Sequence, residues 1–228
     1  MNNPEIIFED SDIVAVNKPA GMIVHSAPGH TESSLADYLA KSRRGMYDCG
    51  SRERPGVVHR LDIGTSGVMV FAKTIRAYRA LREAFESHGR IRKTYLAVLH
   101  GSPKMKTGRI ENTIGRKPWD SKRMAVDVPD GKRAVSEWTV LAKKSGVSLV
   151  EFVIETGRTH QIRVHAAHLG CPIVGDELYG DSAKDRHLRQ KPVRTLLHAV
   201  EITLPHPVSG EIVTFAAEPP ADIVYAIP

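Results

Sequence analysis

The chain has little cysteine, and what it has is not spaced as a motif. Cys49 and Cys171 are the only two cysteines among 228 residues, and they lie far apart in the sequence. Such a pair provides neither the close spacing of a metal-binding motif nor the set of cysteines that staples a small secreted domain. We therefore expect a reducing compartment and predict a cytoplasmic protein.

Long apolar runs and a targeting segment are lacking as well. Residues 1–5, MNNPE, do not have the basic and apolar pattern of a signal peptide. No apolar run approaches the length of about 20 residues that a membrane-spanning helix needs. We predict a soluble protein that has no membrane partner.

Motifs for metals and nucleotides are also missing, although histidine is plentiful. His160 and His165 would point about 140° apart on a helix and to opposite faces of a strand. Only His165 and His168 have the spacing of neighbours on a helix. The zinc-deaminase pattern is absent, and Lys18 lacks the preceding glycines of a phosphate-binding loop. We expect no catalytic metal and no cofactor.

Basic residues are in excess, and they are concentrated. The chain has 32 Lys and Arg against 26 Asp and Glu, which gives a formal net charge of +6. Residues 41–54, 102–133 and 183–194 together contribute +12, so the rest of the chain is net acidic. These stretches are rich in Gly, Pro or Ser, and we expect them to be loops. We interpret them as a surface for a polyanion; solvated loops with chance clustering are the alternative.

Short β-branched runs separated by turn residues dominate the sequence. The predicted strands are residues 6–8, 13–16, 68–71, 95–99, 135–141, 148–154, 196–204 and 212–216. The predicted helices cover residues 74–89 and 159–169, and a third begins at Ser33 or Ser34. This irregular order indicates an α+β fold: a largely antiparallel or mixed β-sheet core with a few flanking helices and basic loops. We expect residues 1–228 to form a single domain.

The segment 59–67, HRLDIGTSG, contains the most informative carboxylate of the chain. Asp62 lies beside basic residues in a glycine-bounded turn directly before a predicted strand. Glycine permits a tight backbone path and the close approach of a ligand. Asp62 is therefore a candidate reactive carboxylate; a side chain that only caps a turn is the alternative.

A second segment, residues 156–165 with the sequence TGRTHQIRVH, supplies further cations. On the predicted helix, Arg163 lies about 100° from Ile162, so it flanks the buried stripe rather than joining it. We predict that Arg163 pairs with Asp62 in one site assembled from distant segments, because a fixed guanidinium stabilises a carboxylate in a pocket. An ordinary surface arginine is the alternative.

Together these segments resemble the RluA-type pseudouridine synthases, which isomerise uridine to pseudouridine in RNA. The resemblance runs nearly end to end, and several signatures in the right order are more specific than one motif. The further matching segments are residues 17–21 (NKPAG), 93–97 (KTYLA), 170–180 and 197–199 (LHA). Longer members begin with an RNA-binding domain of the S4 type, so we expect the short form of the family without an S4 domain.

The resemblance implies a catalytic role for three residues. Asp62 matches the nucleophile, and Arg163 matches its cationic partner. Tyr95 would stack on the target base and take part in proton transfer at its C5 atom; a core aromatic is the alternative. Attack at C1′, attack at C6 of the base and a glycal route all remain open. None of these routes needs a redox change, an energy donor or a metal.

Two groups of residues are expected to contact RNA. Near the carboxylate these are His59, Arg60 and Thr65, and Arg60 matches the residue that fills the stack left by a flipped base. A phosphate contact is the alternative for Arg60. In the second group, Trp119 would stack on an unpaired base, or else pin the basic stretch onto the domain. The cations around Trp119 are Arg116, Lys117, Lys122 and Arg123.

The sequence therefore predicts an isomerase, an RNA pseudouridine synthase that acts on ribosomal RNA, transfer RNA or both. A non-catalytic RNA-binding module of the same fold is the alternative. RNA is the only partner that we expect, and we expect a monomer.

Overall fold

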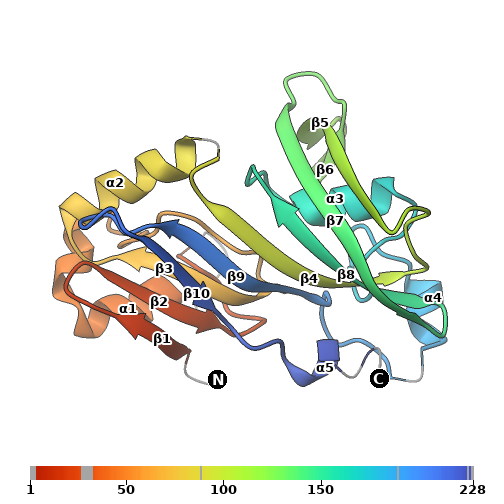
Figure 1. Ribbon diagram of the computed structural model, residues 1–228, viewed down its shortest axis with the longest axis horizontal. Helices are drawn as coiled ribbons and strands as arrows, with labels where there is room; N and C mark the ends of the chain where they lie inside the picture. The colour runs from red at the N-terminus through yellow and green to blue at the C-terminus, as the bar shows by residue number, and fades with distance from the viewer. Residues whose placement is uncertain (1–3, 27–32, 88, 189, 225, 227–228) are drawn as a thin grey trace. The chain divides into compact units, whose positions relative to one another are not determined.

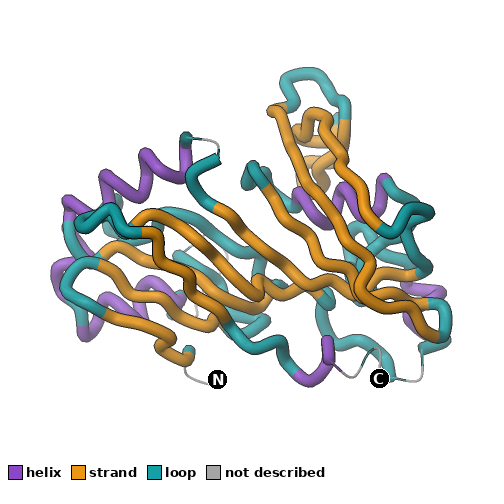
Figure 2. The backbone as a smooth tube through the Cα atoms, viewed as in Figure 1, coloured by secondary structure: helices purple, strands orange, loops and turns teal. Residues whose placement is uncertain are grey.

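The computed structural model describes residues 4–26, 33–87, 89–188, 190–224 and 226. The chain divides into two compact units. The first unit comprises Met1–Arg92 and Ala199–Glu218, and the second comprises Lys93–His198 and Pro219–Pro228. Strands dominate both units, as the orange segments of Figure 2 show. The single domain expected from the sequence remains a prediction.

The first unit is built on a sheet with the strand order β1, β2, β3, β9, β10. Its strands are β1 (Glu5–Glu9), β2 (Ile13–Lys18), β3 (Ser66–Ala72), β9 (Leu197–Pro205) and β10 (Ile212–Ala216). The pairs β1–β2, β2–β3 and β9–β10 are antiparallel. All seven residues of β3 are buried, which explains why this strand is an apolar run without alternation.

Two α-helices and a short 3₁₀ helix complete the first unit. These are α1 (Leu35–Ser42), η1 (Arg44–Asp48) and α2 (Ile75–Glu86). Ser34 starts α1 with a capping box, in which its side chain accepts from the amide of Asp37. Thr74 caps α2 by accepting from the amide of Ala77 at 3.2 Å. Both caps agree with the predicted helix starts.

The second unit is built on a sheet with the strand order β4, β8, β7, β5, β6, and each neighbouring pair is antiparallel. The strands are β4 (Arg92–His100), β5 (Thr107–Lys117), β6 (Asp120–Val126), β7 (Lys132–Lys144) and β8 (Val147–Ile154). Three helices follow in this unit: α3 (Gln161–His168), α4 (Ser182–Arg186) and α5 (Ala221–Val224). Figure 1 shows α3 close to β6 and β7 in this unit.

Two hydrophobic clusters hold the second unit together. One contains Val98, Val147, Val174, Leu196 and Ile223, and joins β4, β8 and α5. The other contains Ile114, Ala134 and Val164, which come from β5, β7 and α3. The second cluster therefore fastens α3 to the strands beside it.

The predicted α+β fold with a largely antiparallel sheet is confirmed, and so are all the predicted strands. The expected loop over residues 102–133 is wrong, because β5, β6 and the start of β7 occupy most of it. The other basic stretches also contain helix: residues 41–54 include η1, and residues 183–194 include most of α4. Arg189, one of the basic residues of the last stretch, lies outside the described residues. Within the described residues, every helix is too short or too polar to cross a membrane.

Candidate active site

A buried lysine fixes the backbone next to Asp62. Lys18, the last residue of β2, is 0% exposed. Its Nζ donates to the carbonyl oxygens of Pro19 at 2.9 Å, Met22 at 2.8 Å and Ile63 at 3.2 Å. An ammonium group has three donors, and a buried charge is costly unless such donors are satisfied. Ile63 adjoins Asp62, so Lys18 ties the NKPAG segment to the loop that carries the candidate carboxylate.

The loop itself turns tightly before it enters β3. The amide of Thr65 donates to the carbonyl oxygen of Asp62 at 3.1 Å. Gly67 has a φ of +119°, and a Cβ at this position would lie 2.2 Å from the carbonyl oxygen of Ala199. Only glycine fits there, because a side chain would be strained and would collide with β9. The loop thus presents Asp62 as a half-buried side chain on a fixed backbone.

The residues that flank Asp62 differ in their surroundings. His59 Nε2 accepts a hydrogen bond from the amide of Val70 at 3.0 Å, and the ring stacks on Phe85 at 4.7 Å between centroids. Thr65 is 2% exposed, whereas Arg60 is exposed. These contacts give His59 and Thr65 structural roles that the sequence did not indicate. RNA contact by the three residues stays a prediction, and Arg60 has the exposure that it requires.

Tyr95 lies in β4 and is 8% exposed. It stands opposite Phe152 of β8, and both predicted roles of Tyr95, base stacking and core packing, are compatible with this burial. Lys93 precedes Tyr95 by two residues, so the two side chains share one face of the strand. Burial, with a smaller contribution from the charge of Arg158, lowers the pKa of Lys93 to about 8. We had not predicted Lys93 as a site residue, although its spacing from Tyr95 was a signal.

Arg163 is buried in α3 and forms a two-pronged ion pair with Asp176. Its Nε lies 2.7 Å from Asp176 Oδ2, and its Nη2 lies 2.8 Å from Asp176 Oδ1. Asp176 Oδ1 also accepts from the amides of Leu178 at 2.9 Å and Tyr179 at 3.1 Å. Burial by itself raises the pKa of the Asp176 carboxyl. The ion pair with Arg163 and the two backbone amides lower it by more, so the pKa lies below its usual value. The alternative of a surface arginine is therefore wrong, and Asp176 is a partner that sequence reasoning missed.

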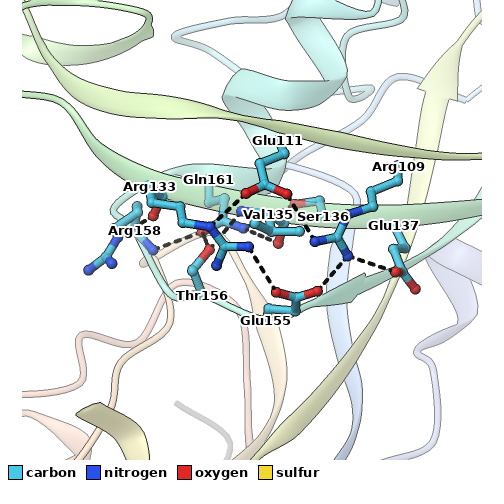
Figure 3. Close-up of polar contacts among 10 residues, drawn as sticks. All are labelled: Arg109, Glu111, Arg133, Val135, Ser136, Glu137, Glu155, Thr156, Arg158 and Gln161. Atoms are coloured by element: carbon cyan, nitrogen blue, oxygen red, sulfur yellow. Dashed lines mark hydrogen bonds and ion pairs between the residues drawn. The ribbon is translucent and has the colours of Figure 1, made fainter. Parts of the chain in front are cut away.

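Buried polar contacts pin the start of α3 to β7. Thr156 Oγ1 accepts from the amide of Val135 at 2.9 Å and donates to Gln161 Oε1 at 2.8 Å. Gln161 Nε2 donates to the carbonyl oxygen of Val135 at 2.9 Å and to Ser136 Oγ at 3.0 Å (Figure 3). Thr156 and Gln161 are 1% and 3% exposed, so these bonds are shielded from water. They fix the helix that carries Arg163.

His165 strengthens the same attachment. It is 0% exposed, and its Nδ1 and Nε2 lie 2.9 Å from Ser136 Oγ and 3.0 Å from Asn112 Oδ1. Burial, with a smaller contribution from His168, lowers the pKa of His165 to about 4. This histidine is a neutral structural group that links α3 to β7 and β5. Among the residues that the structure describes, no group of three or more His, Cys, Asp or Glu side chains could hold a metal ion.

The basic residues around Trp119 form a hairpin. Lys117 of β5 pairs with Asp120 of β6, so Pro118 and Trp119 make a two-residue turn. Trp119 has a φ of +66° and is 102% exposed. The alternative in which Trp119 pins this stretch onto the domain is therefore wrong. The predicted cations are distributed over the two strands, with Arg116 and Lys117 on β5 and Lys122 and Arg123 on β6.

Other arginines of the second unit are neutralised by carboxylates. Arg109 pairs with Glu111 and Glu137, each at 3.0 Å, and with Glu155. Arg133 pairs with Glu111 at 2.7 Å and Glu155 at 3.4 Å, which closes a ring of ion pairs (Figure 3). Exposed ion pairs contribute little to stability. These pairs do affect the surface charge. Arg109 and Arg133 count as basic in the sequence, but the charge of each is balanced by nearby carboxylates.

The predicted site residues are thus divided between the two units. His59, Arg60, Asp62 and Thr65 lie in the first unit, within one loop and its ends. The second unit contains Tyr95, Arg163, Trp119 and the four hairpin cations. Because Asp62 and Arg163 belong to different units, their pairing remains a prediction.

The chain belongs to the RNA pseudouridylate synthase family, whose model matches residues 12–168. A ribosomal large subunit pseudouridine synthase D of Zymomonas mobilis is 40% identical, over 96% of this chain and 70% of its own length. Uncharacterised RNA pseudouridine synthases of Synechocystis and Chloroflexus aurantiacus are 40% and 47% identical over 95% and 91% of this chain. The chain spans 66% and 63% of the lengths of these two relatives.

Solved structures agree with this assignment. The human protein RNA Pseudouridylate Synthase Domain Containing 4 matches with a TM-score of 0.76 at 27% identity, over 97% of this chain and 91% of that chain. The human protein RNA Pseudouridylate Synthase Domain Containing 1 matches with a TM-score of 0.72 at 28% identity, over 95% of this chain and 83% of that chain. The fold is that of a pseudouridine synthase domain.

Proposed function

We propose that the protein isomerises uridine to pseudouridine in structured RNA. The observation that carries this proposal is the family match over residues 12–168, which includes both the Asp62 loop and the Arg163 helix. The local structure supports it. Lys18 fixes the backbone beside Asp62, and Asp176 fixes the guanidinium of Arg163. Two charged groups of opposite sign, each held on a rigid frame, suit catalysis by positioning.

The reaction rearranges bonds within one nucleotide. The bond between N1 of uracil and C1′ of the ribose breaks, the base turns, and C5 of the base forms a new bond to C1′. C5 loses its proton and N1 gains one, so atoms and electrons balance without an oxidant, a reductant or an energy donor. The protein must therefore supply a group that acts on the nucleotide, a surface that holds the detached base, and a route for one proton.

Three side chains are proposed for these tasks. The Asp62 carboxylate acts as the nucleophile, as carboxylates do at the anomeric carbon in retaining glycosidases. Tyr95 holds the base by stacking, and its phenol takes part in the proton transfer at C5. Arg163 stabilises the carboxylate of Asp62, through a guanidinium whose orientation Asp176 already sets. Attack at C1′, attack at C6 and a glycal route are all consistent with these roles.

We propose that the hairpin of β5 and β6 holds the RNA. Trp119 offers a fully exposed aromatic face at the tip, where an unpaired base can stack. The four hairpin cations are suited to bind phosphates on either side of that base. Arg123 has one carboxylate nearby, Asp120 at 3.5 Å, whereas Arg109 faces three carboxylates and Arg133 faces two.

Ribosomal RNA of the large subunit is the first substrate to test, because two relatives are named ribosomal large subunit pseudouridine synthase D. Transfer RNA is the second. A cytoplasmic monomer that needs no cofactor fits this reaction, since the isomerisation requires neither a second substrate nor a redox partner.

The test uses RNA that carries tritium at C5 of uridine, because isomerisation releases that hydrogen into water. The purified protein should release tritium from prefolded ribosomal or transfer RNA without any added cofactor. Sequencing of pseudouridine in cells with and without the gene then identifies the position. Tight RNA binding without tritium release from either RNA would instead indicate a non-catalytic RNA-binding module.

A further inference from the structure

Tyr179 connects the hairpin to the helix that carries Arg163. It lies in the segment that follows α3, and its hydroxyl accepts a hydrogen bond from the amide of Met124 in β6 at 2.7 Å. The same hydroxyl lies 2.8 Å from Nδ1 of His160, the residue that precedes α3. A tyrosine hydroxyl can both accept and donate, so one oxygen joins the strand to the start of the helix.

His160 adopts a conformation that needs such support. Its φ of 57° lies in the left-handed region, which is unfavourable for a residue with a side chain. Its ring meets Tyr179 edge to face at 5.5 Å between centroids. The hydrogen bond and the ring contact offset the backbone strain. Tyr179 therefore stabilises the bend that leads into α3.

The ring and the backbone of Tyr179 also contact the Arg163 ion pair. The guanidinium carbon of Arg163 lies 5.1 Å from the centre of the Tyr179 ring, a cation–π distance. The amide of Tyr179 donates to Asp176 Oδ1, the oxygen that also receives Arg163 Nη2. Gly180 then closes the turn by donating to the carbonyl oxygen of Asp176 at 2.8 Å. One residue thus orients both members of the ion pair.

Apolar packing makes these contacts part of one body. Tyr179 packs, together with Met124 and Val126 of β6, against the cluster of Ile114, Ala134 and Val164. This cluster joins β5, β6, β7 and α3, and interiors packed in this way transmit displacements rather than absorb them. A displacement of β6 would therefore move Tyr179 and, through Tyr179, the side chain of Arg163.

We propose that Tyr179 is a positioning residue, which holds the RNA-contacting hairpin at a fixed distance and angle from the guanidinium of Arg163. The hydroxyl holds the hairpin through its hydrogen bond with Met124, and the ring orients the guanidinium of Arg163 through the cation–π contact. This inference rests on the proposed function, in which the hairpin binds RNA and Arg163 takes part in the chemistry. In this role Tyr179 keeps the RNA accurately placed relative to Arg163, and it does not contact the reacting atoms.

The test compares Tyr179→Phe with the wild type and with a matched control, Tyr38→Phe, which removes a hydroxyl from α1 in the first unit. Tyr179→Phe keeps the ring and loses the hydrogen bonds that the hydroxyl makes with Met124 and His160. We expect its KM for RNA to rise about fivefold, as the loss of about 1 kcal/mol in hydrogen bonding implies, with kcat within about twofold. Tyr179→Leu removes the ring as well, and its kcat should also fall, by about tenfold. Tyr38→Phe should match the wild type.

A double-mutant cycle with Trp119→Ala separates positioning from general stability. If Tyr179 acts by placing the hairpin, Tyr179→Phe should raise KM in the native hairpin and raise it clearly less once Trp119 is gone, because only the hairpin cations then remain to be misplaced. An equal rise of KM in both backgrounds, or an unchanged KM in the folded Tyr179→Phe variant, would overturn the proposal. An inactive wild type would instead count against the proposed function.

Discussion

Replacing Asp176 with Asn should destabilise the second unit strongly, although the two side chains have nearly the same shape. The carboxylate receives Nε and Nη2 of Arg163 at 2.7 and 2.8 Å, and it also receives two backbone amides. The amide group of Asn keeps one acceptor oxygen and turns an N–H₂ toward a donor of the guanidinium. The variant therefore loses at least one charge-assisted bond and removes a carboxylate charge from beside a buried cation.

The size of this effect follows from burial. The side chains of Arg163 and Asp176 are 9% and 0% exposed, so solvent screens the pair very little. Breaking a buried ion pair on one side typically costs about 3–5 kcal/mol, and the isosteric change favours the lower end of that range. We expect the free energy of unfolding to fall by about 3 kcal/mol.

Urea titration followed by tryptophan fluorescence measures this change in the correct part of the chain, because Trp119 and Trp138 both lie in the second unit. Asp181→Asn is the matched control, since Asp181 caps α4 at the surface and Asn is an equally good cap. Its unfolding free energy should stay within about 0.5 kcal/mol of the wild type. A loss below about 1 kcal/mol for Asp176→Asn would refute the reasoning.

Three further predictions concern charge. Neutralising the four hairpin cations should raise KM for RNA and reduce the slope of log affinity against log salt concentration by up to about four units. Neutralising Arg109 and Arg133 should leave that slope nearly unchanged. Equal slopes in the two folded variants would contradict the assignment of the hairpin. The lowered pKa of His165, about 4, means that the unfolded chain binds its proton first, so stability should fall by roughly 3 kcal/mol as pH drops from 6.5 to 4. Urea titrations should show this loss in the wild type and a smaller one in His165→Gln. Lys18→Met should leave three carbonyl oxygens without their shared donor and lower the free energy of unfolding by at least about 2 kcal/mol. Lys18→Arg, which keeps the charge, should still be less stable than the wild type.

Much of the fold was readable from the sequence, because buried strands are apolar runs. β3 and β9 have long apolar stretches and were predicted. β5 and β6 were missed, because TGRIENTIGRK and DSKRMAV contain mostly polar and charged residues. Their strand conformation comes from pairing: β5 lies against β7 over eight register positions, Thr107 to Ile114. Cross-strand pairing of this kind is a tertiary contact, which local propensity does not contain.

The sequence predicted the residue types of the candidate site better than the contacts between them. The resemblance pointed to Asp62 and Arg163, and the helix of Arg163 was predicted from its pattern. Asp176 as the partner of Arg163 depends on a turn that brings together residues 13 positions apart. His165 was weighed as a metal ligand and is a buried structural group instead, because its ring nitrogens face Ser136 of β7 and Asn112 of β5. Such roles are set by which segments pack together.

The most direct measurement is the single-turnover rate of Asp62→Asn on an RNA that the wild type modifies, with the dissociation constant measured on the same RNA. We expect the rate to fall by at least about a thousandfold while affinity stays within about tenfold, because the lost group acts on the bond and phosphate contacts supply most of the binding. A variant that still forms pseudouridine at a rate within about tenfold of the wild type would contradict the assignment of Asp62 as the catalytic carboxylate.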